Sequence, residues 1–317
     1  MATYKEINGT AVQNYAGDLP SAVDGQVWYN STAANFKYNT VLSAAWATGG
    51  NLATARRTLA GAGTQTAGLA FGGVSGGPNL NATEEYDGST WTAGGNLGTA
   101  RQFLAGAGIQ TAGLAFGGSG PTNATEEYDG SAWTAGGNLG TAREKLAGAG
   151  TQTAGLAFGG DPVNNETEEY DGTSWTAGGN LGQGRNLLAG AGTQTAGLAF
   201  GGTPAPLGQT EEYDGSSWTA GGNMNFTRQN LAGAGTQTAG LAIGGELSGS
   251  ATAITEKYDG TSWTTTGSLN TARLDLAGCG TQTAGLAFGG CTSPPTGLAA
   301  TEEFTGGGPG TATITTT

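Results

Sequence analysis

Short runs of small and apolar residues alternate with polar turns along this chain. The motif Leu-Ala-Gly-x-Gly-x-Gln-Thr-Ala-Gly-Leu-Ala-(Phe/Ile)-Gly-Gly holds two such runs on either side of a polar turn. The segment Thr-Glu-(Glu/Lys)-(Tyr/Phe) and a segment around a Trp follow, and Asp-Gly between them is a strong signal of a β-hairpin turn. In the first copy the four strands are expected at residues 59–63, 67–71, 83–86 and around Trp91. The pattern predicts a unit of four short strands that alternate in direction.

The whole unit occurs six times, and its spacing is regular. From one Gly-Gly pair to the next the steps are 45, 42, 42, 43 and 45 residues, a period found in propellers and other repeat arrays. The interval from the repeat Arg to Gly-Gly is 16 residues in all six copies, and the interval from Trp to the next Arg is always 10. The variation in length is therefore confined to the loop between the second and third strands.

The two ends of the repeat region complement each other. The last copy supplies three strands and has no Trp strand after Phe304, whereas an unmatched Trp46 precedes the first repeat Arg. Adding the Trp46 strand to the last blade would close a ring of six four-stranded blades and remove its exposed edges. Phe36-Lys37-Tyr38 also has the pattern of a strand, so a contribution of two N-terminal strands to that blade is an alternative that the sequence leaves open.

The repeat residues resemble the kelch family over about residues 35 to 304. The resemblance rests on Gly-Gly after the second strand, Tyr-Asp-Gly at the end of the third, Trp five residues after the Tyr, and Thr-Ala-Arg before the next copy. It implies an all-β, six-bladed β-propeller. The Glu pairs and the six repeat arginines are then expected to serve the structure, the arginines by pairing with acidic groups or blade carbonyls. These arginines are Arg56, Arg101, Arg143, Arg185, Arg228 and Arg273.

Composition and charge narrow the classes of partner. The chain has 63 glycines, only 11% charged residues and a formal net charge of -13, and six of its eleven basic residues are the repeat arginines. An acidic chain without a basic run is a poor match for nucleic acid. It also lacks an apolar segment of roughly 18 residues and the apolar region of a signal peptide. We therefore expect no nucleic-acid partner, no membrane insertion and no encoded export signal.

Alternation of strand direction sorts the connections onto two faces of the propeller. The turns after the first and third strands share one face and are almost identical in all copies. The loop after the second strand and the connection to the next blade share the other face, called the variable face here. This face carries the pair of residues after each repeat Arg and the loops 74–82, 119–124, 161–166, 203–209, 246–254 and 291–300.

A rigid scaffold with variable loops is typical of a recognition surface. Loop drift without a packing constraint is the alternative explanation. Among the candidate ligand-binding residues, the aromatic Phe103 and Phe226 are expected to be exposed for stacking or else to cap a blade. The full set of candidates is Phe103, Phe226, Arg57, Lys145, Asn186 and Asn230.

The residue types of this chain give little support for an enzymatic function. Some kelch propellers are copper oxidases, but such copper sites need imidazole ligands and this chain has no histidine. Asp87-Gly-Ser-Thr-Trp91 resembles a sialidase Asp box but places the Trp too close to the Asp, and a hairpin explains it better. Cys279 and Cys291 are expected to remain reduced, because the strand geometry places them too far apart for a disulfide. We predict a protein that is not an enzyme, with no catalytic residues, no cofactor and no metal.

Residues 1 to 34 lie outside the repeat and carry a second resemblance. Asp24-Gly-Gln-Val-Trp-Tyr-Asn30, a Ser/Thr turn, a Lys-Tyr strand and Ala-Ala-Trp46 resemble a short element of bacteriophage tail-fibre and other virion proteins. The resemblance implies attachment to other virion proteins through residues 1–34, and an ordinary hairpin that seals the propeller is the alternative. Residues 305–317 are expected to form a flexible Gly/Thr-rich tail with a strand-prone end.

These observations predict three segments, 1–34, 35–304 and 305–317. The leading functional hypothesis is a non-enzymatic bacteriophage virion protein of the fibre, tail or decoration type, assembled in the host cytoplasm. Its propeller would display the variable face to a host-surface glycan or protein. A bacterial kelch-like protein-interaction module and a glycan-cleaving propeller enzyme are the alternatives.

Overall fold

The structure is a computed structural model, and it describes residues 14–16, 26–204 and 208–313. Its contacts divide the chain into two compact units. One unit is Ala45–Thr305, and the other joins Met1–Ala44 to Gly306–Thr317. No helix in the described part of the chain is long and apolar enough to span a bilayer.

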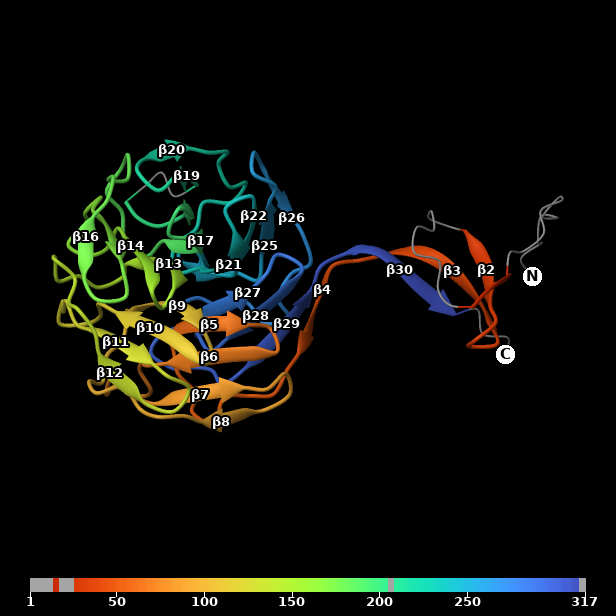
Figure 1. Cartoon of the computed structure of the whole chain (residues 1–317), viewed down its shortest axis with the longest axis horizontal. Helices are drawn as coiled ribbons and strands as arrows, with labels where there is room; N and C mark the ends of the chain where they lie inside the picture. Colours follow the sequence, from red (N-terminus) through yellow and green to blue (C-terminus); the bar gives the residue numbers. More distant parts are fainter. Residues whose placement is uncertain (1–13, 17–25, 205–207, 314–317) are drawn as a thin grey trace. The chain divides into compact units, whose positions relative to one another are not determined.

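The unit Ala45–Thr305 is a six-bladed β-propeller with four-stranded blades, which confirms the predicted fold class (Figure 1). Blade 1 consists of β5 (Ala60–Thr64), β6 (Ala67–Phe71), β7 (Thr83–Tyr86) and β8 (Trp91–Ala93). Blade 2 consists of β9 (Ala105–Ile109), β10 (Ala112–Phe116), β11 (Thr125–Tyr128) and β12 (Trp133–Ala135). Blade 3 consists of β13 (Ala147–Thr151), β14 (Ala154–Phe158), β15 (Thr167–Tyr170) and β16 (Trp175–Ala177).

The remaining three blades follow the same order. Blade 4 consists of β17 (Ala189–Thr193), β18 (Ala196–Phe200), β19 (Thr210–Tyr213) and β20 (Trp218–Ala220). Blade 5 consists of β21 (Ala232–Thr236), β22 (Ala239–Ile243), β25 (Thr255–Tyr258) and β26 (Trp263–Thr265), and its variable loop carries the small hairpin β23 (Glu246–Leu247) and β24 (Ser250–Ala251). Blade 6 consists of β27 (Ala277–Gly280), β28 (Ala284–Phe288), β29 (Thr301–Thr305) and β4 (Ala45–Thr48).

The ring closes through the N-terminal strand β4. Its Trp46 lies opposite Phe304 of β29 in an antiparallel register, as predicted from the unmatched Trp. The alternative, in which Phe36–Tyr38 adds a second strand to this blade, is wrong. Residues 36–38 belong to β3 (Asn35–Leu42), which pairs with β2 (Val27–Asn30) and β30 (Gly308–Thr313) and not with a blade.

Small residues line the propeller axis because the inner strands approach one another closely. A Cβ atom at Gly106 of β9 would lie 2.6 Å from Phe71 Cζ and 2.8 Å from the carbonyl oxygen of Gly61. Farther from the axis the blades diverge, and larger side chains fill the gap. The rings of Phe71 and Trp133 of the next blade lie 4.9 Å apart, and Leu69 is fully buried. This distribution of side chains is the one expected from the widening space between blades.

Two kinds of polar contact join each pair of neighbouring blades on a repeating plan. Trp133 Nε1 donates to Thr83 Oγ1 at 2.9 Å, and the corresponding Trp–Thr bond occurs at all six interfaces. Gln110 Nε2 donates to the carbonyl oxygens of Gly68 and Tyr86 at 3.1 and 2.7 Å, and the repeated Gln does the same in every blade. The constant Gln-Thr turn is therefore part of the interface between blades.

The repeat arginines are buried inside the blades, and each pairs with the Glu that follows Thr at the start of the third strand, as expected. Arg143 Nη2 lies 2.9 Å from Glu168 Oε1, and Arg143 Nη1 donates to the carbonyl oxygens of Gly159 and Glu166. Burial lowers the pKa of Arg143, and the charge of Glu168 opposes this effect. The equivalent pairs are Arg56–Glu84, Arg101–Glu126, Arg185–Glu211, Arg228–Glu256 and Arg273–Glu302. These arginines tie the third strand and the variable loop to the start of each blade.

The Asp-Gly segments form hairpin turns, as predicted. Asp87 Oδ1 accepts backbone hydrogen bonds from Ser89 and Thr90 at 2.8 and 2.7 Å. These bonds, together with side-chain bonds from the same two residues, lower the pKa of the exposed Asp87 to about 2. Cys279 and Cys291 are buried free thiols, as expected.

The second unit contains a four-stranded sheet in the order β1-β2-β3-β30, with β1 at Asn14–Tyr15. On one side of β2 the Trp28 side chain is fully buried, whereas Val27, Phe36 and Tyr38 of the β2–β3 hairpin are exposed. Asn35–Leu42 was expected in the propeller segment, but it lies in this unit because its backbone pairs with β2 and β30. In the C-terminal tail, β30 begins at Gly308, so the expectation of a flexible Gly-Pro-Gly linker is wrong for residues 308–310. β30 covers residues 311–313 of the expected strand-prone end, and residues 314–317 lie outside the described residues.

Candidate functional site at the mouth of the propeller axis

Six backbone hydrogen bonds form a closed ring around the axis on the variable face. Phe103 N donates to Thr58 O, Lys145 N donates to Phe103 O, and the series continues around the axis until Thr58 N donates to Asp275 O, with distances of 2.8 to 3.0 Å. Each member is the second residue after a repeat Arg. In ring order the members, called the rim residues here, are Thr58, Phe103, Lys145, Leu187, Asn230 and Asp275.

All six rim residues have a left-handed backbone, with φ between 54° and 58°. This region is unfavourable for residues with a Cβ atom and is normally occupied by glycine. The chain has 63 glycines, yet none of the six rim positions is glycine. Strained conformations that persist in a fold concentrate at functional sites. The rim is therefore the candidate site, because six different side chains are retained where glycine would be easier to accommodate.

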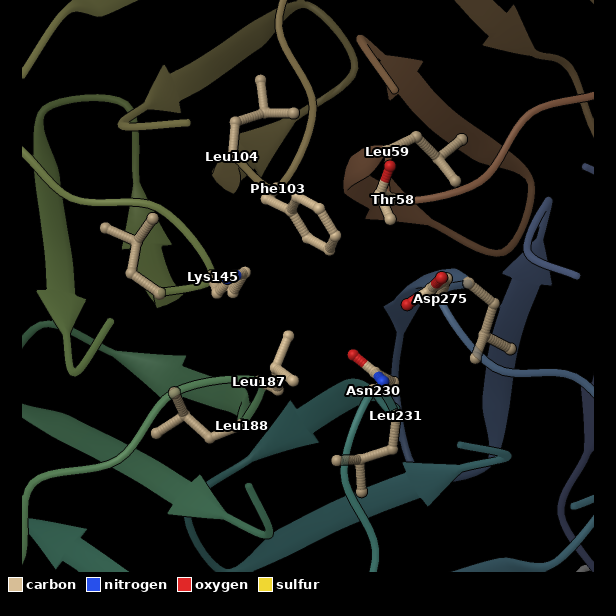
Figure 2. A pocket seen from close by; sticks show the side chains of 12 residues that line it. Thr58, Leu59, Phe103, Leu104, Lys145, Leu187, Leu188, Asn230, Leu231 and Asp275 are labelled. Atoms are coloured by element: carbon tan, nitrogen blue, oxygen red, sulfur yellow. The ribbon is translucent and has the colours of Figure 1, made fainter. Parts of the chain in front are cut away.

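The rim encloses a cavity of about 100 Å³ at the mouth of the axial channel. Figure 2 shows the side chains of Phe103, Leu187 and Asn230 pointing toward its middle. Six buried leucines, each directly after a rim residue, also line it, and the same leucines line the Ala- and Gly-lined axial channel. They are Leu59, Leu104, Leu146, Leu188, Leu231 and Leu276. Figure 2 shows the side chains of Leu59, Leu104, Leu188 and Leu231 pointing away from the axis, so they border the cavity rather than form a floor across it. The cavity is called the mouth from here on, and its rim has mixed chemistry.

The ring order divides the rim into two halves. Phe103, Lys145 and Leu187 are consecutive and present an aromatic ring, aliphatic carbon and the Lys145 ammonium group, whereas the other three members present amide, carboxylate and hydroxyl groups. In a ring of six residues, each residue lies across the axis from the residue three places further along the ring. Phe103 therefore lies across the axis from Asn230. The rim is amphipathic from one side to the other.

Neighbouring loop residues hold the polar rim side chains in place. Lys145 Nζ lies 2.6 Å from Asp161 Oδ2 and 3.3 Å from Glu144 Oε1, and its hydrogen bond to Asp161 is the main cause of its raised pKa. Lys145 Nζ also lies 5.6 Å from the centre of the Phe103 ring, within cation–π range. Asn230 Nδ2 donates to Glu246 Oε2 at 3.3 Å. Lys145 and Asn230 therefore already have partners within the protein at the mouth.

A buried ion pair completes the polar half of the rim. Arg57 Nη1 lies 3.1 Å from Asp275 Oδ2, and both side chains are largely buried. Burial raises the pKa of Asp275, and the charge of Arg57 opposes this effect. Four carboxylates therefore stand around two cations at the mouth, which leaves its surroundings acidic.

Three of the six residues that the sequence suggested for ligand binding line the mouth, namely Phe103, Lys145 and Asn230. Arg57 lies beside it through the ion pair with Asp275. Asn186 and Phe226 lie on the same face but do not line the mouth. Asn186 is buried with its backbone paired to Thr203, and Phe226 is half-buried in the connection that precedes Arg228.

Thr58, Leu187 and Asp275 were not selected from the sequence, although each belongs to a variable pair after a repeat Arg. In most blades the first member of that pair bridges to the variable loop, as Glu144 does to Asp161, and the second member stands on the rim. The sequence signal for these three residues is their position, because each is the second residue after a repeat Arg. Sequence variation alone does not single out this position, because the two positions of each pair vary to a similar degree.

No group of three or more His, Cys, Asp or Glu residues with the arrangement of a metal site occurs among the described residues. Neither a protein family model nor a curated protein matches the chain. The geometry thus defines the chain as a six-bladed β-propeller with a built cavity at its axis.

Proposed function

We propose that this chain is a non-enzymatic, kelch-like recognition protein of a bacteriophage particle, of the fibre, tail or decoration type. Its propeller presents the mouth and the surrounding variable loops to a molecule on the host surface. The observation that carries the proposal is the rim: six unlike, non-glycine side chains share one strained backbone conformation around a preformed cavity. A scaffold of near-identical blades that differ at the rim is suited to recognition rather than to chemistry.

The contacts of the acidic residues support a role without catalysis. In each blade the first Glu pairs with the repeat Arg, and at five blade interfaces the second Glu accepts a hydrogen bond from a Tyr hydroxyl. Asp275 at the rim is held by Arg57. A general acid or base must be within reach of a substrate proton, and these carboxylates are already occupied by structural partners.

The second unit is the proposed attachment segment. Its Asp24–Asn30 motif, which resembles an element of phage virion proteins, runs into β2, and β2 forms a hairpin with β3. Val27, Phe36 and Tyr38 leave one side of this hairpin apolar and exposed. Exposed apolar patches of this kind are typical of protein contacts. Attachment through this unit, after assembly in the host cytoplasm, would leave the propeller available for host recognition.

Three measurements test the proposal. Mass spectrometry of purified particles of the phage that encodes the chain should detect it as a component, and the labelled full-length chain should bind host cells. Absence from the particles would overturn the virion assignment, and a gene neighbourhood without capsid or tail genes would then favour a bacterial interaction module. Release of fragments from host polysaccharide by the purified chain would contradict the non-enzymatic role.

A further inference from the structure

We propose that the mouth binds a single neutral sugar ring at the exposed end of a host-surface glycan. This inference rests on the proposed recognition function and names the ligand class of the same site. It follows from the charge around the mouth, the amphipathic rim and the closed backbone ring.

The charge around the mouth argues against anionic ligands. Glu144, Asp161 and Glu246 stand beside the rim, and Asp275 stands on it, while Arg57 and Lys145 supply the cations. Both cations are already paired with carboxylates at 2.6 to 3.3 Å. A carboxylate or phosphate would have to displace these partners and would meet an acidic surrounding within a chain of net charge -13. A neutral ligand would neither displace these ion-pair partners nor be repelled by the acidic surrounding.

The two halves of the rim match the two chemical characters of a pyranose ring. Phe103 and Leu187 offer apolar surface for the C–H face of a sugar, and the aromatic face carries the partial negative charge that attracts such hydrogens. Asn230, Asp275 and Thr58 present amide, carboxylate and hydroxyl groups on the other half of the ring, where hydroxyl groups can be recognised. Thr58 Oγ1 already lies 2.6 Å from Arg57 O and 3.0 Å from Gln102 Oε1, so the groups left for a ligand are the oxygen lone pairs of Asn230 and Asp275 that Glu246 and Arg57 do not use. A purely apolar ligand would desolvate these oxygens without replacing their hydrogen bonds to water, which costs free energy.

The backbone ring argues against an extended peptide. Every rim N–H and C=O that faces its neighbour is already used in the closed ring of six hydrogen bonds, as at Phe103 N and Thr58 O. Among the described residues, the rim therefore offers no strand edge for β-augmentation. The cavity of about 100 Å³ is too small to enclose more than part of one sugar ring, so it can seat one side of a terminal group rather than a chain that passes through it. Recognition is left to side chains, and the ligand approaches from the variable face.

The left-handed backbone allows a test that separates binding from folding. Glycine favours φ near 54°, so Phe103→Gly and Asn230→Gly remove a side chain while keeping the backbone geometry of the rim. Phe226→Ala is the matched control, because Phe226 lies on the same face but does not line the mouth. The probes are a glycan array and titration calorimetry with methyl glycosides of glucose, galactose, mannose and N-acetylglucosamine, with sialyllactose and a lysine-rich peptide as charged comparisons.

We expect a neutral glycoside to bind the full-length chain. Phe103→Gly should weaken it about tenfold, Asn230→Gly roughly threefold to tenfold, and Phe226→Ala should have no effect. Thermal melting should show all three variants folded. Binding of the charged probes alone, or neutral binding that survives both glycine variants, would overturn the inference.

A cell-binding assay distinguishes failure of this inference from failure of the proposed function. If no sugar binds but the labelled chain binds host cells and Phe103→Gly abolishes that binding, the recognition function stands and the sugar class is wrong. If neither sugars nor host cells are bound, both proposals are overturned.

Discussion

The hydroxyl group of Tyr258 in blade 5 donates to Glu212 Oε1 in blade 4 at 2.6 Å. The tyrosine oxygen approaches so closely that a Cβ atom at Gly221 would lie 2.6 Å from it. The same three-residue arrangement of Tyr, second Glu and Gly recurs at five of the six blade interfaces. At the interface between blades 5 and 6 all three residues change together, to Phe304, Lys257 and Thr266. Loss of the hydroxyl group removes the need for both the acceptor and the glycine.

The first prediction concerns this interface. Phe304→Tyr alone should lower stability, because its hydroxyl would meet the side chain of Thr266 and find a lysine in place of the glutamate acceptor. Adding Lys257→Glu and Thr266→Gly should restore the arrangement of the other interfaces and raise the free energy of unfolding above that of the single variant by about 1 to 3 kcal/mol. Urea denaturation of the single and triple variants measures the difference. A triple variant no more stable than Phe304→Tyr would contradict the argument.

A second prediction tests the buried Arg–Glu pairs. Glu168→Gln removes the charge that compensates the fully buried Arg143. Whichever way its amide turns, the amide nitrogen would face a donor, because the two carboxylate oxygens accept from Arg143 Nη2 and from the backbone N–H of Gly140, so we expect a loss of about 3 to 5 kcal/mol. The double variant Arg143→Met, Glu168→Leu should recover much of this loss, because no uncompensated charge remains. The urea denaturation midpoints of the wild type, of Glu168→Gln and of the double variant measure these differences in stability. Equal midpoints for the wild type and Glu168→Gln would show that the pair has no net role.

The scaffold could be predicted from the sequence because its determinants repeat. Six copies of one motif report the same strands and turns six times, and the unmatched Trp46 identifies the closing strand. The sequence left the role of Phe36–Tyr38 open, since a strand pattern does not state its partner. The backbone pairing of β3 with β30 joins residues from opposite ends of the chain, and nothing local encodes it.

The candidate site could be predicted only in part. Variation after each repeat Arg located the face, but the rim depends on which residue of each pair takes the left-handed conformation. That choice is made by the ring of hydrogen bonds between blades, as between Lys145 N and Phe103 O, and not by the residue itself. Leu187 and Thr58 have no intrinsic preference for such a backbone. Their place on the rim therefore requires the assembled propeller.

The third prediction separates a rim residue from the buried leucine that follows it. Leu187→Gly removes a strained side chain, so the variant should be as stable as the wild type or more stable, by up to about 1 kcal/mol. Leu188→Ala, one residue later, truncates a buried side chain and should cost about 2 to 5 kcal/mol. Thermal and urea unfolding of the two variants provide the measurement. A large loss of stability in Leu187→Gly would mean that its side chain is retained for packing rather than for function.

The last prediction concerns alkaline pH. Burial, with a smaller contribution from the hydrogen bond to the neighbouring Glu, raises the pKa of the five interface tyrosines to about 12, compared with an ordinary value of 10. A raised pKa means that the folded state favours the protonated hydroxyl, so the contribution to stability is complete below pH 10 and is lost as the pH rises toward 12. Ionisation would also place a tyrosinate against a glutamate.

We therefore expect the melting temperature to fall steeply between about pH 10 and 12, together with the appearance of tyrosinate absorbance. Tyr128→Phe should reduce the steepness, because one of the five coupled groups is removed, while Tyr38→Phe on the exposed hairpin should leave it unchanged. A melting temperature that stays constant across this range, or that falls equally in all three proteins, would contradict the assignment of the alkaline transition to the blade interfaces.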